Sequence, residues 1–199
     1  MRKIIIATNN RHKFGEILQI FKPDEIGIEF LFGGDIAKKS PAETGNSFYE
    51  NALLKAKYYS QIANLPAIAD DSGLIVNILG DEPGLYSARY AGKNCTYEDN
   101  NRKLLERLQN VPKEKRIAYF ICISVLYFPD GFTFTTEGIM NGRIADYSRG
   151  EGGFGYDPIF ELFDGRTVAQ IPQDEKNKIS HRAKAFRTMK KILESIESL

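Results

Sequence analysis

Two adjacent aspartates near the middle of the chain constrain its fold more than any other feature. Asp70 and Asp71 follow the apolar pair Ile68-Ala69 and precede Ser72-Gly73, after which a second, mostly apolar run covers residues 74–79. Short apolar runs are typical of buried strands, whereas Asp, Ser and Gly are typical of turns. The sequence therefore predicts two strands with both acids at a strand end, the place where open α/β sheets usually hold their ligands.

The charge of this pair also needs an explanation. Two neighbouring carboxylates repel each other, and the pKa of one rises unless a cation neutralises them. A hard divalent metal ion bound through oxygen is the usual solution. An Asp-rich turn without a ligand is the alternative on this stretch alone.

Composition limits the class of protein. The 199 residues are 42% hydrophobic and 27% charged with a net charge of +1, which predicts one globular domain over residues 1–199 and no general nucleic-acid or membrane partner. Cys95 and Cys122 lack metal-ligand spacing, and two thiols in a chain of this size favour a reducing compartment. The apolar run after Lys3 is too short for a signal peptide. We therefore expect a cytoplasmic protein.

The N-terminal segment predicts an anion site. A strand over residues 3–7 leads into Thr8-Asn9-Asn10, which are good helix caps, and then into a helical pattern. Free backbone N–H groups at a helix start favour an anion, and Lys13 adds positive charge one turn later. The loop lacks the glycines of the P-loop motif. A capped helix with a solvated lysine is the alternative.

The second segment predicts a long helix preceded by an acid. Residues 48–63 carry an apolar stripe from Phe48 to Ala63, and Lys55 falls off its middle, so that it borders a pocket or faces water. Glu43 lies in the loop before this helix, where a carboxylate either caps the helix or binds a metal ion. Taken alone, capping is the simpler role.

The remaining pattern predicts alternating strands and helices. Further strands are expected at residues 26–32, 117–128 and 132–137, with a bend at Gly138 and Gly142 and a short strand at 143–145; further helices follow Thr96 and Ser180. The segment 149–160 has four glycines in six residues with Phe154 and Tyr156 among them, which lets a backbone approach a flat ligand that an aromatic ring stacks upon. A plain surface loop is the alternative. A basic cluster at residues 176–182 precedes the last helix and favours anionic ligand atoms.

These features together predict a site for a nucleotide polyphosphate and Mg²⁺. Five motifs occur in one order: Thr8-Asn9-Asn10 with Lys13, Ala69 to Leu74, Ser87 to Gly92, Gly152 to Pro158, and Ser180-His181-Arg182. In this order and over nearly the whole chain, the sequence resembles the inosine triphosphate pyrophosphatase family, whose members remove non-standard purine triphosphates such as ITP, dITP and XTP.

The resemblance implies an α/β fold in which a long, twisted mixed sheet flanked by helices divides two lobes with a central substrate cleft. It implies a Mg²⁺-dependent homodimer that cleaves between the α- and β-phosphates. Asp71 would bind Mg²⁺ and activate water as the catalytic residue, with Glu43 as the second metal ligand and Asp70 in a structural role. The implied phosphate contacts are Thr8, Asn9, Asn10, Arg11, His12 and Lys13, with Lys55 and Lys176 neutralising charge.

The resemblance also implies how the base is recognised. The implied substrate contacts are Ser72, the base cradle Phe154, Gly155, Tyr156 and Asp157 with Phe154 as the stacking ring, and His181 and Arg182 at the base edge. Hypoxanthine and xanthine accept a hydrogen bond at the 6-keto oxygen, whereas adenine donates from its 6-amino group, so an arginine there disfavours adenine.

One departure and three alternatives accompany this interpretation. Gln170 stands where we expect the family to carry a glutamate, and that acid would order the loop of Lys176. A related pyrophosphatase for modified pyrimidine or other nucleotides is disfavoured only by the base-facing residues. A nucleotide-binding regulator has little need for Asp71, Glu43 and Lys13 together. A purely structural protein leaves the charged and glycine clusters unexplained.

Overall fold

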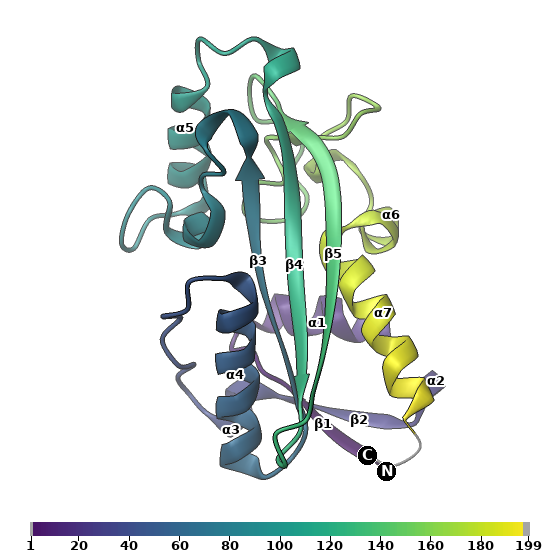
Figure 1. Ribbon diagram of the computed structural model, residues 1–199. Coiled ribbons are helices and arrows are strands. Elements are labelled where there is room, and N and C mark those ends of the chain that lie inside the picture. The colour runs from purple at the N-terminus through teal and green to yellow at the C-terminus, as the bar shows by residue number, and fades with distance from the viewer. Residues whose placement is uncertain (1, 197–199) are drawn as a thin grey trace. The chain divides into compact units, whose positions relative to one another are not determined.

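The computed structural model describes residues 2–196, which form an α/β fold on one six-stranded sheet (Figure 1). The strands are β1 (Arg2–Ile6), β2 (Ile28–Phe32), β3 (Ala67–Val76), β4 (Ile117–Tyr127), β5 (Thr133–Ile144) and β6 (Phe160–Glu161). Their order in the sheet is β2-β1-β3-β4-β5-β6. β1 pairs in parallel with β2 and β3, while β5 and β6 are antiparallel. The predicted mixed sheet is confirmed.

Helices occupy most of the remaining chain. The α-helices are α1 (Arg11–Phe21), α2 (Pro23–Ile26), α3 (Gly33–Ile36), α4 (Phe48–Ala63), α5 (Tyr97–Arg107), α6 (Gln173–Ile179) and α7 (His181–Ser195). Short 3₁₀ helices cover Asn77–Leu79, Gly84–Arg89, Lys113–Lys115 and Val168–Gln170. No helix among residues 2–196 has the length and apolar character needed to cross a membrane.

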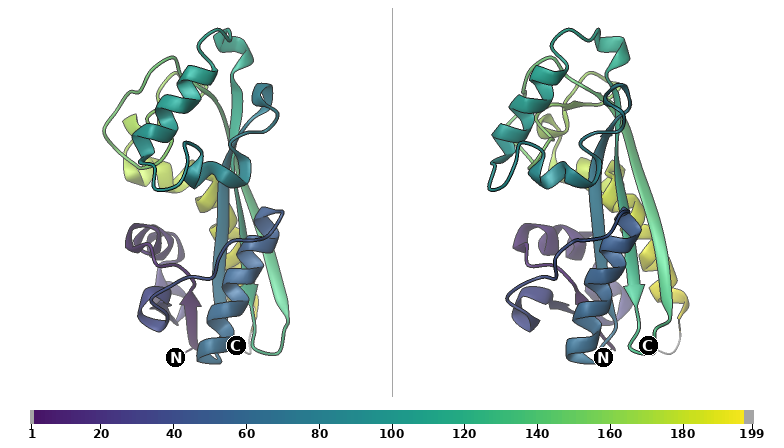
Figure 2. Two further views of the ribbon diagram at one scale, coloured as in Figure 1. Left: turned by 90° about the vertical axis from the view of Figure 1, so that its left-hand side faces the viewer. Right: turned by 60° about the vertical axis from the view of Figure 1, so that its left-hand side comes forward.

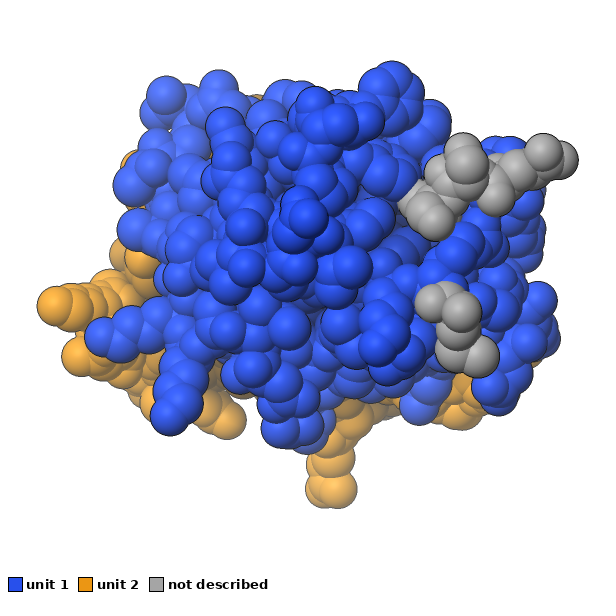
Figure 3. Space-filling model, turned by 90° about the horizontal axis from the view of Figure 1, so that it is seen from below, with its two compact units in different colours: residues 1–71, 122–138, 181–199 blue, residues 72–121, 139–180 orange. Residues whose placement is uncertain are grey.

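The chain divides into two compact units, shown in different colours in Figure 3. The first unit contains residues 1–71, 122–138 and 181–199, and the second contains residues 72–121 and 139–180. Strands β3, β4 and β5 are continuous segments that begin in one unit and end in the other.

The core of the first unit follows the two-residue alternation of β1. Ile4 and Ile6 pack in a cluster with side chains of α1 and α7, whereas Ile5 packs in a second cluster with α4. Successive side chains of a strand point to opposite faces, so the run of isoleucines is buried on both sides. The same alternation continues in β3, where Ile68 joins the first cluster and Ala69 joins the second.

The two acids lie inside a strand. β3 is one strand from Ala67 to Val76 that includes Asp70, Asp71, Ser72 and Gly73, so the prediction of a strand end at this point is wrong. Residue types that favour turns predict a strand end here. The strand continues because cations of the flanking helices compensate the buried charges, as described below. The apolar run also ends earlier than predicted, since residues 77–79 form a 3₁₀ turn.

The hairpin of β4 and β5 is confirmed, but its second strand is longer than predicted (Figures 1 and 2). β5 continues through Gly138 and Gly142 as one strand and includes most of the predicted strand at 143–145. A β-carbon on Gly138 would lie 2.0 Å from the carbonyl oxygen of His181, and one on Gly142 would lie 2.5 Å from that of Glu161. These glycines therefore permit close backbone packing.

Other boundaries differ in smaller ways. The predicted strand at 26–32 begins at Ile28, because Ile26 ends the short helix α2. The predicted basic segment before the last helix is itself helical over α6. Helix α4 has the predicted bounds, and α5 begins with the predicted capping box between Thr96 and Asp99.

Candidate active site

Asp70 points toward α1 and α7 of the first unit. Its Oδ1 lies 2.8 Å from Lys13 Nζ, and its Oδ2 lies 3.3 Å from Arg182 Nε. Arg182 also donates from Nη1 to Glu16 Oε2 at 2.8 Å, which makes a buried chain of two cations and two carboxylates. Burial alone would raise the pKa of Asp70, but Lys13 and Arg182 outweigh it and hold that pKa well below its ordinary value.

Asp71 faces α4 on the opposite side of the strand. Its Oδ2 accepts from Asn51 Nδ2 at 3.1 Å, and its Oδ1 lies 3.5 Å from Lys55 Nζ. Lys55 Nζ in turn lies 2.6 Å from Glu43 Oε1. The adjacent acids therefore do not share one site: strand alternation sends them to opposite faces, and each has its own cations.

The two aspartates differ in their protonation chemistry. Burial raises the pKa of Asp71; Lys55 opposes this shift without cancelling it, and the negative charge of Glu43 adds to it. For Lys55, burial favours the neutral amine, but Asp71 and Glu43 outweigh it and raise its pKa. The structure thus contains a depressed carboxyl and an elevated one in consecutive residues, the pattern by which sites assign different roles to two acids.

The loop after β1 forms the predicted helix cap. Asn10 is the N-cap of α1, and its side chain accepts from the backbone N–H of Lys13 at 3.1 Å. Thr8 is buried, whereas Asn9 is exposed and accepts from the hydroxyl of Tyr59 at 2.8 Å. A β-carbon on Gly33 would lie 2.8 Å from the backbone nitrogen of Thr8, so the backbone of this loop packs directly against the backbone of Gly33.

The other predicted phosphate contacts differ in exposure. Arg11 and His12 are exposed in the first turn of α1. Arg11 lies 3.6 Å from Asp35 and stacks over the ring of Phe32 at 4.6 Å. Lys13 of the same segment contacts Asp70, and burial lowers the pKa of this lysine despite the opposing charge of Asp70.

Sequence reasoning missed Asn51. Its side chain is 3% exposed and joins Asp71 to the loop of Glu43, because its Oδ1 accepts from the backbone N–H of Gly45 at 2.8 Å. The signal was present in the helical pattern: Asn51 and Lys55 are four residues apart and therefore project from one side of α4. Polar residues at that spacing beside an alanine stripe indicate a buried polar site.

The carboxylates of Glu43 and Asp71, near α4, suit a magnesium ion with few protein ligands. Among residues 2–196, no group of three or more His, Cys, Asp or Glu side chains is placed to hold a metal ion. Glu43 and Asp71 nevertheless converge on one cation, the ammonium of Lys55. Mg²⁺ commonly uses one or two carboxylates and takes its other ligands from water and substrate phosphates. The residues therefore fit the predicted metal.

The predicted base cradle lies in the second unit. Lys176 Nζ is 2.6 Å from Asp157 Oδ2 and 4.6 Å from the ring centroid of Phe154. The same carboxylate oxygen accepts from the backbone N–H of Phe154 at 2.9 Å. Tyr156 is buried and donates its hydroxyl to the carbonyl of Ser87 at 2.9 Å. Asp157 and Tyr156 therefore fix the loop, and Phe154 keeps 38% of its surface exposed.

A cavity of about 720 Å³ lies between this loop and α5. Phe154 and Gly155 contribute to its lining together with Tyr97, whose ring centroid is 6.3 Å from that of Phe154. Asn101 Nδ2 donates to the carbonyl of Gly155 at 3.0 Å and ties the loop to the helix. Ser72 belongs to this unit, while His181 and Arg182 belong to the first.

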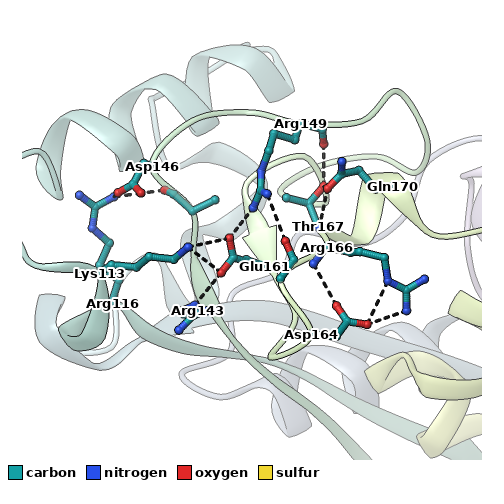
Figure 4. Close-up of polar contacts among 12 residues, drawn as sticks. Lys113, Arg116, Arg143, Asp146, Arg149, Glu161, Asp164, Arg166, Thr167 and Gln170 are labelled. Atoms are coloured by element: carbon teal, nitrogen blue, oxygen red, sulfur yellow. Dashed lines mark hydrogen bonds and ion pairs between the residues drawn. The ribbon is translucent and has the colours of Figure 1, made fainter.

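A charged cluster around Glu161 contacts the start of the glycine-rich segment 149–160, here called the glycine loop (Figure 4). Glu161 is 1% exposed, and its carboxylate contacts Lys113 at 3.0 Å, Arg143 at 2.7 Å and also Arg149, which begins the loop. Gln170, the predicted departure from the family, accepts from the backbone N–H of Thr167 at 2.9 Å and completes a capping box. The glutamine therefore has a local structural role.

We expect Glu161→Gln to destabilise the protein by roughly 2–3 kcal/mol at pH 7, because it leaves three cations around a neutral amide. Burial alone would raise the pKa of Glu161, but Lys113, Arg143 and Arg149 lower it. A depressed pKa contributes stability above the unfolded value, near 4.3, that is lost as the pH falls through the folded value. The stability difference from wild type should therefore shrink between pH 7 and pH 3.5.

Urea unfolding at both pH values measures this difference, with the exposed Glu114→Gln as the matched control. An equal difference at the two pH values would contradict the assigned electrostatic role of Glu161.

The chain is similar to known proteins both in sequence and in structure. Residues 4–192 match the Ham1 family. A "dITP/XTP pyrophosphatase" of Thermoanaerobacter sp. (strain X514) is 46% identical over 197 residues, which are 98% of each chain. The Staphylococcus aureus Ham1 protein has a TM-score of 0.87 at 41% identity and covers 97% of this chain and 98% of its own. A HAM1 protein from Coxiella burnetii has a TM-score of 0.91 at 36% identity and covers 98% and 100%.

These matches define a nucleotide-pyrophosphatase-like α/β protein. The chain belongs to the Ham1 family. The resemblance to inosine triphosphate pyrophosphatases, predicted from the five motifs, is therefore confirmed at the level of the family. The roles of the individual site residues stay predictions.

Proposed function

We propose that this protein hydrolyses ITP, dITP and XTP to the nucleoside monophosphate and pyrophosphate, and so clears them from the nucleotide pool. The observation that carries this proposal is the 46% identity over 98% of the chain to a "dITP/XTP pyrophosphatase". The arrangement of Lys13, Glu43, Lys55 and Asp71 in the first unit supports it, because these groups suit a polyphosphate and its metal ion.

The proposed reaction needs charge neutralisation and an oriented water. Glu43 and Asp71 would hold Mg²⁺, which supplies charge neutralisation on the phosphates and an acidified water when bound. Asp71 would orient the attacking water and accept its proton, and the elevated pKa of its carboxyl suits a base. Lys13 and the cap of α1 would hold phosphate oxygens. Water would add to one phosphorus of the bond between the α- and β-phosphates, while the bond from that phosphorus to the bridging oxygen breaks and pyrophosphate leaves.

The base would stack on Phe154, whose ring is partly exposed on a loop fixed by Asp157. Arg182 would face the 6-keto oxygen. In the structure its guanidinium is buried against Asp70 and Glu16, so its orientation is already fixed by two carboxylates. A fixed donor favours a keto group over an amino group.

A substrate panel tests the reaction and the substrate class together. ITP, dITP, XTP, GTP, ATP and CTP are incubated with and without Mg²⁺, and pyrophosphate and orthophosphate are both measured. Mg²⁺-dependent pyrophosphate from ITP and XTP, with little from ATP or GTP, is the expected result. Orthophosphate would indicate cleavage at the terminal phosphate and contradict the mechanism. A preference for CTP would favour a related pyrophosphatase that acts on pyrimidine nucleotides. Binding of a nucleotide without any product would favour a nucleotide-binding regulator.

Phe154→Ala should raise the KM for ITP about tenfold, because stacking of a base on an aromatic ring contributes roughly 1–3 kcal/mol. Steady-state kinetics measure this change. Phe163→Ala is the control, since Phe163 is in the same unit and 63% exposed. Equal KM values for the wild type and Phe154→Ala would remove Phe154 from base binding.

We also propose a cytoplasmic homodimer. Neither Cys95 nor Cys122 forms a disulfide, which suits a reducing compartment.

The dimer is implied by the resemblance to the family, and sedimentation equilibrium at several protein concentrations tests it. A single species of the monomer mass of 22.5 kDa would contradict the proposed dimer.

A further inference from the structure

We propose that Lys55 competes with the divalent metal ion for Glu43 and Asp71, so that the metal binds tightly only when a polyphosphate provides another partner for the lysine. This inference deepens the proposed function and rests on it. It concerns how one side chain of this protein regulates its own metal site.

The ammonium of Lys55 already lies close to both carboxylates. Lys55 Nζ lies 2.6 Å from Glu43 Oε1 and 3.5 Å from Asp71 Oδ1. The ammonium therefore takes the place between the carboxylates that a shared metal ion would need. A Mg²⁺ ion binds oxygen at about 2.1 Å, so it and the ammonium cannot both lie directly between the same two oxygen atoms.

The charges of the three groups favour one cation over two at this place. Two carboxylates with one ammonium carry a net charge of about −1, and a divalent ion in place of the ammonium makes the set neutral. Both cations together would leave an excess positive charge in a place where the Lys55 side chain is only 9% exposed. A buried charge without a partner is costly, so the lysine requires a new anion when the metal enters. Phosphate oxygens provide one.

The side-chain end of Lys55 can change position although its backbone cannot. The backbone of Lys55 is fixed in the middle of α4, whose Ala52, Ala56 and Tyr59 are fully buried. A lysine head on its four-carbon stem can still change position by rotation. Asn51 holds Asp71 through Oδ2 and holds the Glu43 loop through Gly45, so both acids stay organised when the ammonium leaves.

The consequence is coupled binding. A metal ion that displaces the ammonium prepares Lys55 for phosphate, and phosphate that draws the ammonium away opens the carboxylates to metal. Such coupling is reciprocal by thermodynamic necessity. It would keep one cation between the two carboxylates between turnovers, so that they are never left without a positive partner.

Metal binding to the nucleotide-free protein tests the competition. Mn²⁺ binding is measured by electron paramagnetic resonance for the wild type, Lys55→Met and Lys55→Gln. Both neutral variants should bind Mn²⁺ roughly tenfold more tightly than wild type, within the range typical of coupled sites. Lys55→Arg keeps the charge and should not tighten binding. Lys57→Met, an exposed position of the same helix, is the control.

Glu43→Gln distinguishes the two ways in which this test can fail. Weakened Mn²⁺ binding in Glu43→Gln, with no gain in either neutral Lys55 variant, would overturn the competition and leave the proposed metal site intact. Unchanged binding in Glu43→Gln would show that the metal lies elsewhere, which overturns both the site and the competition. Circular dichroism of each variant checks that the fold is retained.

Discussion

Asp71→Asn is expected to lower kcat for ITP by about 10³-fold or more while leaving the fold intact. The amide has nearly the same shape but can neither accept the proton of water nor carry the charge that a metal ligand needs. The carboxyl is partly accessible, with 13% of its side chain exposed, and its elevated pKa indicates no strong stabilisation of its charged form. Loss of its charge should therefore affect chemistry more than stability.

The measurement is pyrophosphate release from ITP in Mg²⁺, accompanied by thermal unfolding of each variant. Asp24→Asn replaces an exposed acid of α2 in the same unit and should leave both quantities near wild type. A turnover rate of Asp71→Asn within a few-fold of wild type would exclude the assigned catalytic role. A large loss of stability would instead show that its charge holds α4 in place through Lys55.

Asp70 illustrates what the sequence could and could not predict. The sequence centres on this acid pair, and only the family resemblance assigns different roles to Asp70 and Asp71. Residue types alone predict both acids at a strand end, because a charged pair inside a strand is unfavourable without partners. The partners are Lys13 and Arg182, which are 57 and 112 residues away from Asp70 in sequence. No local pattern contains that information.

Local signals were more reliable where local forces dominate. The bounds of α4 and the capping box at Thr96 were predicted, and the cap of α1 is one of three predicted candidates, Asn10, since each feature depends on residues within one or two helical turns. The position of Lys55 was left open between a pocket and water, and the structure places it in a buried ion pair. Strand β5 was broken in the prediction at two glycines that serve packing against α7 and β6.

Arg182→Gln should destabilise the protein by roughly 3–5 kcal/mol, the loss expected when one partner of a buried ion pair is removed. Arg182 is 5% exposed and contacts two carboxylates that are also buried, Glu16 at 7% and Asp70 at 3%. Lys13 still balances Asp70 in this variant, so Glu16 loses the most. Urea unfolding at pH 7 measures the change.

The double variant Glu16→Gln, Arg182→Gln separates this electrostatic loss from a loss of packing. If the ion pair dominates, the double variant should be less destabilised than the sum of the two single variants by roughly 1–3 kcal/mol. Strict additivity would mean that the two side chains act independently.

The ratio of kcat/KM for ITP over ATP, measured well below the unfolding temperature, then tests whether Arg182 recognises the base. A ratio that narrows in Arg182→Gln and stays unchanged in Glu161→Gln, a second destabilised variant, would show that Arg182 selects the keto base as well as stabilising the fold. An unchanged ratio in both variants would restrict Arg182 to its buried ion pairs.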